Sequence, residues 1–211
     1  MVPAGPQDLD VAEELGGDAV MDLLDRPSVR LPGPCPEIET ARLTLRPHRP
    51  GDADAIAQSL ADFQVARMLS RVPAPYDRQD AADWLSRVRS GLTPDWALAI
   101  TTGDDVHIGV VGLELRHGLW HLGYWLNRYY WGRGLMSEAA SAAIERFFRR
   151  MPDVVLHSGA FADNTASLRI QEKLGFSVKG CGDLYSLARN AVAPHIETEL
   201  TQAGFRPAAR C

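Results

Sequence analysis

Cysteine is scarce in this sequence, and its few cysteines form no pattern. Only three of the 211 residues are cysteine, Cys35, Cys181 and Cys211, and none of them belongs to a Cys-x-x-Cys pair. An odd and dispersed set predicts neither a disulfide framework nor a zinc site. We therefore expect a protein without a metal.

Long apolar runs and an excess of positive charge are missing as well. No stretch approaches the roughly 18 apolar residues that a membrane-spanning helix needs, and the first residues lack the basic-then-apolar order of a secretory signal. The net charge is −5, so no basic field is available to hold nucleic acid. These absences predict a cytoplasmic protein with no membrane or nucleic-acid partner.

What the sequence does contain is ordinary for a globular protein. Apolar residues make up 45% and charged residues 23%, and the length fits one domain plus an extension. We expect residues 1–36 to form an acidic extension that ends in a proline-rich linker, Pro32 to Pro36. The main domain should span 37–205, and 206–211 should be a tail.

Apolar periodicity and turn residues predict alternating strands and helices. Strands are expected at 41–47, 95–102, 107–116, 119–127, 154–162, near 176–181 and near 194–201. Helices are expected at 50–62, 64–70, 76–91, 135–150 and 164–175. A strand that follows a crossover helix lies parallel to the strand before it, so 154–162 should pair with 119–127. This order predicts an α/β protein with a mixed sheet of about seven strands.

Residues 129–138 read Tyr-Tyr-Trp-Gly-Arg-Gly-Leu-Met-Ser-Glu, between a strand and an alanine-rich helix. Backbone N–H groups at a helix start lack partners and carry partial positive charge, and glycine lets a phosphate approach them. The pattern predicts a pyrophosphate cradle, although it also fits a plain tight turn. It is neither a P-loop nor a three-glycine dinucleotide motif. The cradle would consist of Gly132, Arg133, Gly134, Leu135, Met136 and the hydroxyl of Ser137.

A second block, residues 163–176, contains a short helix. Asp163 or Asn164 should cap its start, and Gly175 should end it. At helical spacing, Asn164, Ser167, Gln171 and Leu174 form one stripe, which favours a helix that faces a wet cleft. Alternatively, Asn164 is only a cap and Ser167 only a tolerated small residue.

Together the two blocks resemble the GCN5-related N-acetyltransferase (GNAT) superfamily, in particular its RimJ/RimL-like branch. The glycine signature (Gln/Arg)-x-x-Gly-x-(Gly/Ala) falls on residues 129–134, with Tyr129 in the first position. The branch's Asn-x-x-Ser-x-x-x-x-Glu-Lys-x-Gly-Phe signature falls on 164–176, and residues 40–47 resemble its first strand. The resemblance covers roughly residues 38–202.

This resemblance implies a central sheet that splays between two parallel strands and holds acetyl-CoA as cosubstrate. The pantetheine arm would lie along Trp125, Leu126 and Asn127, where one N–H group polarises the thioester carbonyl. The pyrophosphate would lie on the glycine loop. Further contacts are expected from Tyr129, Trp131, Asn164, Ser167 and Lys173.

Acetyl transfer also needs a base and an acid. Glu114 and His121 are the candidate bases, because both lie on strands beside the expected cleft and histidine titrates near neutral pH. By alternation, His121, Gly123 and Trp125 share one strand face. The resemblance implies Ser167, with Asn164 beside it, as the partner of the leaving thiolate. Many relatives carry a proton-donating tyrosine at the position of Gln171. Because glutamine cannot take this role, Tyr185 in a following loop is an alternative acid.

We interpret the sequence as an acetyl-CoA-dependent N-acetyltransferase that acts on a primary amine, either a protein N-terminus or a small molecule. It should be a monomer or homodimer, with acceptor residues in loops near 63–80 and 182–193. Because Tyr129 and Gln171 depart from the family pattern, a non-catalytic acyl-CoA-binding module is the alternative.

Overall fold

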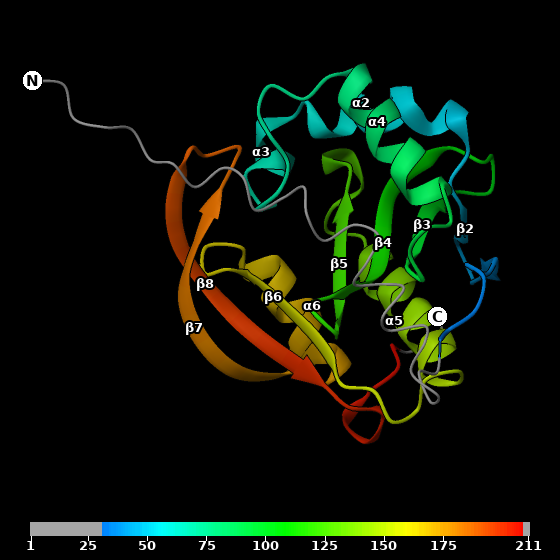
Figure 1. Cartoon of the computed structure of the whole chain (residues 1–211), viewed down its shortest axis with the longest axis vertical. Coiled ribbons are helices and arrows are strands. Elements are labelled where there is room, and N and C mark those ends of the chain that lie inside the picture. The colour runs from blue at the N-terminus through cyan, green and yellow to red at the C-terminus, as the bar shows by residue number, and fades with distance from the viewer. Residues whose placement is uncertain (1–30, 209–211) are drawn as a thin grey trace, which may run out of the picture. The chain divides into compact units, whose positions relative to one another are not determined.

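A computed structural model of the chain describes residues 31–208 (Figure 1). The predicted acidic segment therefore lies outside the described residues, whereas the proline-rich linker lies within them. The indole N–H of Trp96 donates to Gly33 O over 2.8 Å, and Nη1 of Arg150 donates to Pro32 O over 2.6 Å. The linker thus packs against the main domain, and the expected boundary after residue 36 stays a prediction.

The core of the fold is an eight-stranded mixed sheet with the order β1-β2-β3-β4-β5-β6-β8-β7. Only β5 and β6 pair in parallel, and every other neighbouring pair is antiparallel. This confirms the predicted mixed sheet and the predicted parallel pair. The strands are β1 (Ile38–Glu39), β2 (Thr44–Pro47), β3 (Trp96–Thr101), β4 (His107–Arg116), β5 (Leu119–Leu126), β6 (Leu156–Phe161), β7 (Ser177–Ser186) and β8 (Ala191–Leu200).

All the predicted helices are present, with somewhat tighter bounds. Asp77 begins one of them with a capping box, and Asn164 caps another. Gly175 ends the latter with a φ of 95°, which glycine adopts without a steric penalty. The helices are α2 (Ala53–Leu60), α3 (Phe63–Ala66), α4 (Arg78–Arg89), α5 (Leu135–Phe148) and α6 (Thr165–Leu174), with short 3₁₀ turns η1 (Pro50–Asp52), η2 (Arg128–Tyr130) and η3 (Gln202–Gly204).

Two apolar clusters stabilise the sheet from its opposite faces. The larger contains α5, whose Met136, Ala140, Ala143 and Phe147 are buried as predicted, and the smaller lies under α2, α3 and α4. Along β5, Leu122 and Leu126 belong to the larger cluster, whereas Trp125 packs against the smaller one. The period of two along a strand thus divides β5 between the two faces.

The parallel pair β5–β6 is joined only at its beginning. The register pairs Trp120 with Leu156 and His121 with His157 and then stops. One residue further on, the Ser158 hydroxyl donates to Leu122 O over 3.0 Å. Beyond this point the two strands separate, so a gap opens along the second half of β5.

The β7–β8 hairpin differs from the prediction. Residues 182–193 were expected to form a loop, but β7 continues to Ser186 and β8 begins at Ala191. The turn between the strands docks on the segment after α3, because Leu187 N donates to Ser70 O and Arg189 Nε donates to Arg67 O, over 3.0 and 2.7 Å. The hairpin tip and the 67–77 segment therefore meet.

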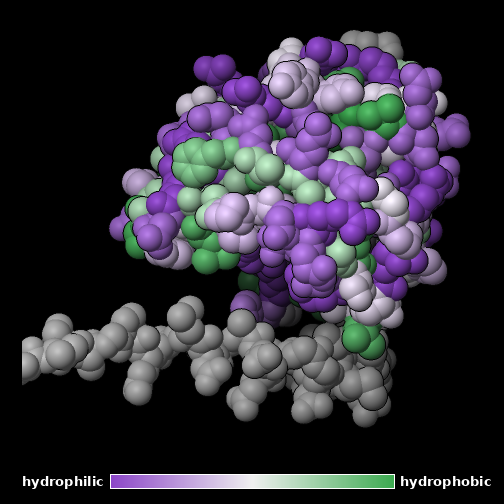
Figure 2. Space-filling view, turned by 90° about the horizontal axis from the view of Figure 1, so that it is seen from above, coloured by the Kyte–Doolittle hydropathy of each residue, from purple (hydrophilic) through white to green (hydrophobic). Residues whose placement is uncertain are grey.

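The face of the molecule drawn in Figure 2 carries mostly hydrophilic side chains, with apolar ones gathered in a few patches. Within the part of the chain that the structure describes, no helix has both the length and the apolarity to cross a membrane.

Candidate active site

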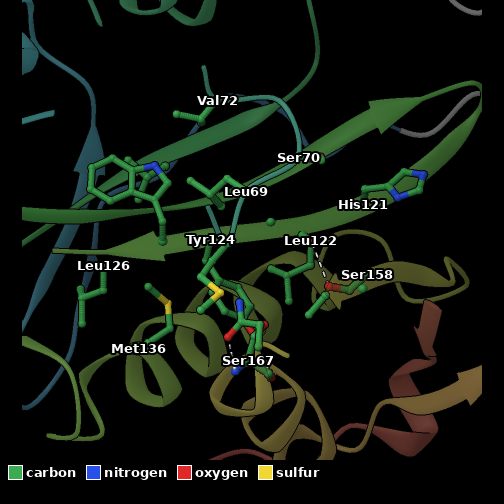
Figure 3. A pocket seen from close by; sticks show the side chains of 18 of the residues that line it. Leu69, Ser70, Val72, His121, Leu122, Tyr124, Leu126, Met136, Ser158 and Ser167 are labelled. Carbon is green, nitrogen blue, oxygen red and sulfur yellow. Dashed lines mark hydrogen bonds between the residues drawn. The ribbon is translucent and has the colours of Figure 1, made fainter. Parts of the chain in front are cut away.

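A cleft of about 1570 Å³ occupies the gap between β5 and β6 (Figure 3). Residues of α4 also line it. This volume exceeds the roughly 300–1,000 Å³ of a pocket for a single small ligand. The cleft therefore has room for a long ligand and for a second molecule beside it.

The glycine loop forms one end of this cleft. Gly132 and Gly134 have φ values of 74° and 73°, in the left-handed region that glycine adopts most readily. A Cβ atom at Gly132 would meet nothing within 4 Å, and one at Gly134 would meet only Arg42 Nη2 at 3.7 Å. Both glycines thus border open space, which fits a cradle for a phosphate group.

Helix α5 begins directly at this loop. Gly134 is its N-cap, and the first helical hydrogen bond runs from Glu138 N to Gly134 O over 3.2 Å. The N–H groups of Leu135, Met136 and Ser137 precede that bond, so the helix supplies them with no partner. An anion at this position would also be favoured by the positive end of the helix dipole.

A strap that was not predicted from the sequence holds the loop in place. Glu138 accepts hydrogen bonds from the Thr40 hydroxyl, the Arg42 backbone N–H and Arg42 Nε, over 2.7, 2.9 and 2.7 Å. Arg42 Nη1 in turn donates to Arg133 O over 3.0 Å. Burial would raise the pKa of Glu138, but the hydrogen bonds from Thr40 and Arg42 outweigh it and lower the pKa. The ionised carboxylate thus ties the loop to the chain just before β2.

The backbone of β5 offers the gap a different set of groups from the expected one. Asn127 N donates to Ile108 O over 2.8 Å, so Asn127 faces β4. The backbone N–H and C=O groups of neighbouring residues in a strand point in opposite directions. Those of Trp125 therefore also point toward β4, while those of Tyr124 and Leu126 point into the gap. The indole N–H of Trp131 donates to Leu126 O over 2.7 Å.

Asn127 instead has a structural role. Its Oδ1 accepts from Tyr129 N over 3.0 Å, and its Nδ2 donates to Ser59 Oγ over 2.9 Å. The side chain thus caps η2 and links it to α2.

A cluster of hydroxyl groups lies where β5 and β6 separate. Tyr124 Oη lies 3.0 Å from Ser167 Oγ and 3.2 Å from Ser167 O. Figure 3 shows Tyr124 directed from β5 toward Ser167 on α6. Burial raises the pKa of Tyr124, and its hydrogen bonds with Ser167 and Gln171 offset this only in part. Tyr124 therefore keeps its proton at neutral pH.

Sequence reasoning missed Tyr124, although a signal was present. The alternation that groups His121, Gly123 and Trp125 places Tyr124 on the other face of β5, toward α6. Only the fold shows that Ser167 lies opposite it.

The candidate bases Glu114 and His121 are paired across β4 and β5. Arg71 Nη2 and Arg116 Nη2 both donate to Glu114 Oε2, over 2.8 and 2.6 Å. Burial would raise the pKa of Glu114, but the two arginines outweigh it and lower the pKa. Desolvation, followed by the charges of Arg116 and His157, lowers the pKa of His121 to about 4. Both groups are therefore weaker bases than their ordinary values indicate.

Most of the residues predicted from the sequence line the cleft, but four do not. Asn127, Tyr129 and Arg133 lie outside it, and Tyr129 is 76% exposed. Tyr185 is also outside, and its hydroxyl donates to Asn190 on the hairpin. The predicted residues that line the cleft are Glu114, His121, Trp125, Leu126, Trp131, Gly132, Gly134, Leu135, Met136, Ser137, Asn164, Ser167 and Lys173.

Among the described residues, one buried group has side chains of the kind that bind metals, namely His48, Asp52 and His107. Asp52 already accepts from Arg46 Nη1, Arg46 Nη2 and Arg49 N, over 3.0, 2.9 and 2.8 Å. His48 Nδ1 lies 3.3 Å from Asp52 Oδ2, and burial lowers the pKa of both His48 and His107. The three side chains thus form a buried cluster around the ion pair between Arg46 and Asp52.

Comparison with known proteins identifies the family. Residues 42–177 match the Acetyltransferase (GNAT) domain, so the chain belongs to the GNAT family and is an N-acetyltransferase of that family. It is 28% identical to the uncharacterized N-acetyltransferase p20 of Bacillus licheniformis over 148 residues, which are 67% of this chain and 82% of that protein.

Solved structures share the fold. Mycobacterium smegmatis RimJ, in complex with CoA-disulfide, superposes with a TM-score of 0.71 at 18% identity over 83% of this chain and 91% of its own. The ribosomal-protein-S5-alanine acetyltransferase from Vibrio fischeri gives a TM-score of 0.67 at 19% identity over 82% of this chain and all 100% of its own. The RimJ/RimL-like resemblance seen in the sequence is thus confirmed at the level of the fold.

Proposed function

We propose that this acetyltransferase uses acetyl-CoA to acetylate an amine of low pKa, in particular the N-terminal α-amine of a protein or peptide. The observation that carries the proposal is the pair of hydroxyl groups, Ser167 and Tyr124, at the point where β5 and β6 separate. The open glycine cradle lies at one end of the same cleft.

The residues present fit acetyl-CoA. The N–H groups at the start of α5 would bind its pyrophosphate, with Lys173 on the facing helix as a cation. The gap-facing backbone of Tyr124 and Leu126 would bind the pantetheine arm as an added strand does. When bound, acetyl-CoA supplies an activated acetyl thioester. Ser167 would then donate a proton to the leaving sulfur, with the Tyr124 hydroxyl as its partner.

The choice of amine follows from the weak bases. His121 has a pKa of about 4, and the pKa of Glu114 is also lowered, so neither group readily removes a proton from an ammonium ion. The cleft therefore selects an amine that is already neutral. At pH 7 roughly 9% of an α-amine is neutral, but only roughly 0.04% of a lysine side chain, from their ordinary pKa values of about 8 and 10.4. This difference of roughly 200-fold favours the α-amine.

The S5-alanine acetyltransferase that shares the fold is named for a protein substrate, which supports the same class of acceptor. Acidic side chains also line the cleft, among them Asp80, Asp83 and Asp95, and they suit an amine-bearing partner.

Three peptides of one sequence test the acceptor. The first has a free N-terminus and no lysine, the second a blocked N-terminus and one lysine, and the third neither amine. After incubation with acetyl-CoA, mass spectrometry should find the acetyl group on the first peptide alone. Preferential acetylation of the lysine peptide would contradict the proposal. Acetyl-CoA binding without acetylation of any peptide or small amine would favour the non-catalytic acyl-CoA-binding alternative.

A further inference from the structure

Behind Ser167 lies a side-chain amide whose orientation is fixed by its surroundings. Gln171 is 1% exposed, and its amide is surrounded by polar groups. Its Nε2 lies 3.3 Å from Gly159 O and 3.2 Å from Ser167 Oγ, and its Oε1 lies 2.7 Å from Thr198 Oγ1. The carbonyl of Gly159 only accepts hydrogen bonds, so the amide must turn its N–H₂ group toward it. Thr198 must then donate its own proton to Oε1.

This order of donors constrains the hydroxyl of Ser167. Its oxygen accepts from Gln171 Nε2. Tyr124 Oη lies 3.0 Å from Ser167 Oγ and 3.2 Å from the carbonyl oxygen of Ser167, so its single proton can go to either oxygen. When Gln171 and Tyr124 both donate to Ser167 Oγ, its two lone pairs are occupied, and its proton is left to point into the cleft. Hydrogen bonds in a chain polarise one another, so a hydroxyl that accepts two bonds is a better donor itself.

We propose that Thr198 and Gln171 are positioning residues that act through Ser167, turning its proton toward the sulfur of the leaving group. The proposal rests on the proposed function. It also gives Gln171 a role at the position where many members of the superfamily carry an acidic tyrosine.

The proton transfers balance. As the carbon–sulfur bond breaks, the sulfur keeps the electron pair and takes the proton of Ser167 Oγ. The Tyr124 proton replaces it, and solvent returns one proton to Tyr124. The acceptor amine loses one proton to solvent as its nitrogen bonds to the acetyl carbon, so no proton is gained or lost overall.

Thr198→Val tests the chain, because it removes the donor and nearly preserves the shape. We expect kcat to fall about three- to tenfold, as for the loss of one hydrogen bond, with an unchanged KM for acetyl-CoA. Thr198→Ser keeps the hydroxyl and should restore kcat. Thr101→Val is the matched control, because Thr101 is 1% exposed on β3 and donates to Thr44 O over 3.1 Å. It should leave kcat unchanged.

The decisive measurement repeats Thr198→Val in a Ser167→Ala background. If Thr198 acts through Ser167, the second substitution should lower kcat no further. An equal fold loss in both backgrounds would show a merely structural role and overturn the proposal, as would wild-type kcat in Thr198→Val alone. If Thr198→Val does not fold, Gln171→Met takes its place in both backgrounds. Absence of turnover by the wild-type protein with every amine would instead reject the proposed function, and the positioning role with it.

Discussion

Replacing Gly134 by alanine should affect two properties that can be measured separately, namely the stability of the fold and the affinity for acetyl-CoA. Gly134 has a φ of 73° and a ψ of 2°, a left-handed conformation that costs an L-residue about 1–2 kcal/mol. The added methyl would make only an ordinary contact, with Arg42 Nη2 at 3.7 Å. The free energy of unfolding should therefore fall by about 1–2 kcal/mol, which lowers Tm by roughly 2–8 °C for a domain of this size.

Binding of acetyl-CoA should fall as well, for a reason separate from this strain. The methyl would occupy the space in which a phosphate approaches the N–H groups of α5, so we expect at least a tenfold loss of affinity, or about 1.4 kcal/mol. Calorimetric titration with acetyl-CoA and thermal unfolding measure the two effects separately. Gly134→Asn should cost less stability, because asparagine tolerates this conformation better than alanine, and should still impair binding.

Gly118→Ala is the matched control. Gly118 has a φ of 78° and nothing within 4 Å of an added Cβ, so the same strain applies. Gly118 precedes β5 and the cradle follows it, so the eight residues of this strand, at about 3.3 Å each, separate the two glycines. Gly118→Ala should lose similar stability and keep wild-type affinity. If Gly134→Ala and Gly118→Ala both bind acetyl-CoA as the wild type does, the pyrophosphate assignment is wrong.

Three further predictions concern other parts of the molecule. Tyr124→Phe should lower kcat about tenfold with an unchanged KM for acetyl-CoA, and steady-state kinetics with normal kcat would remove Tyr124 from the reaction. The pKa of His121 is lowered to about 4, so His121 stays neutral as the pH falls through 6.5 and becomes charged only near 4. The pH profile of kcat/KM should therefore lack a histidine limb between pH 6 and 7, and a limb there that disappears in His121→Asn would contradict the lowered pKa. Asp52→Asn should reduce the free energy of unfolding by about 3–5 kcal/mol, because it breaks a buried pair with Arg46; urea denaturation at neutral pH with a loss below 1 kcal/mol would refute this. The pKa of Asp52 is held far below its usual value against the effect of burial, so the pair stabilises fully above about pH 4 and weakens as the pH falls below it.

The sequence predicted the fold well where local signals and burial agree. Helix α6 has a capping Asn164 and a terminal Gly175, and α5 has a continuous buried stripe, so both were found near their observed bounds. The hairpin β7–β8 was not found in full. Nearly all of β7 is exposed, and Gly180 and Gly182 interrupt any apolar alternation. The length of β7 is set by its backbone pairing with β8. This pairing requires no alternation of apolar and polar side chains that the sequence could reveal.

The candidate site was predictable as separate motifs but not as an arrangement. The glycine loop and Ser167 could be named because their chemistry lies in a short segment. The residues that contact the candidate site residues and set their pKa values or positions come from distant parts of the chain. Arg71 reaches Glu114 from the segment after α3, Tyr124 reaches Ser167 from β5, and Arg42 straps the loop from before β2. Only the folded chain brings these pairs together.

The release of free thiol from acetyl-CoA, in the presence of a peptide with a free N-terminus, tests the central claim most directly. The rate is read with a thiol-reactive dye after subtraction of the protein's own three cysteines. Wild-type protein should release one thiol for each peptide acetylated, and Ser167→Ala should bind acetyl-CoA normally but release thiol at least tenfold more slowly. A protein that binds acetyl-CoA in the calorimeter but releases no thiol above the spontaneous rate, with this peptide or any other amine, would contradict the account.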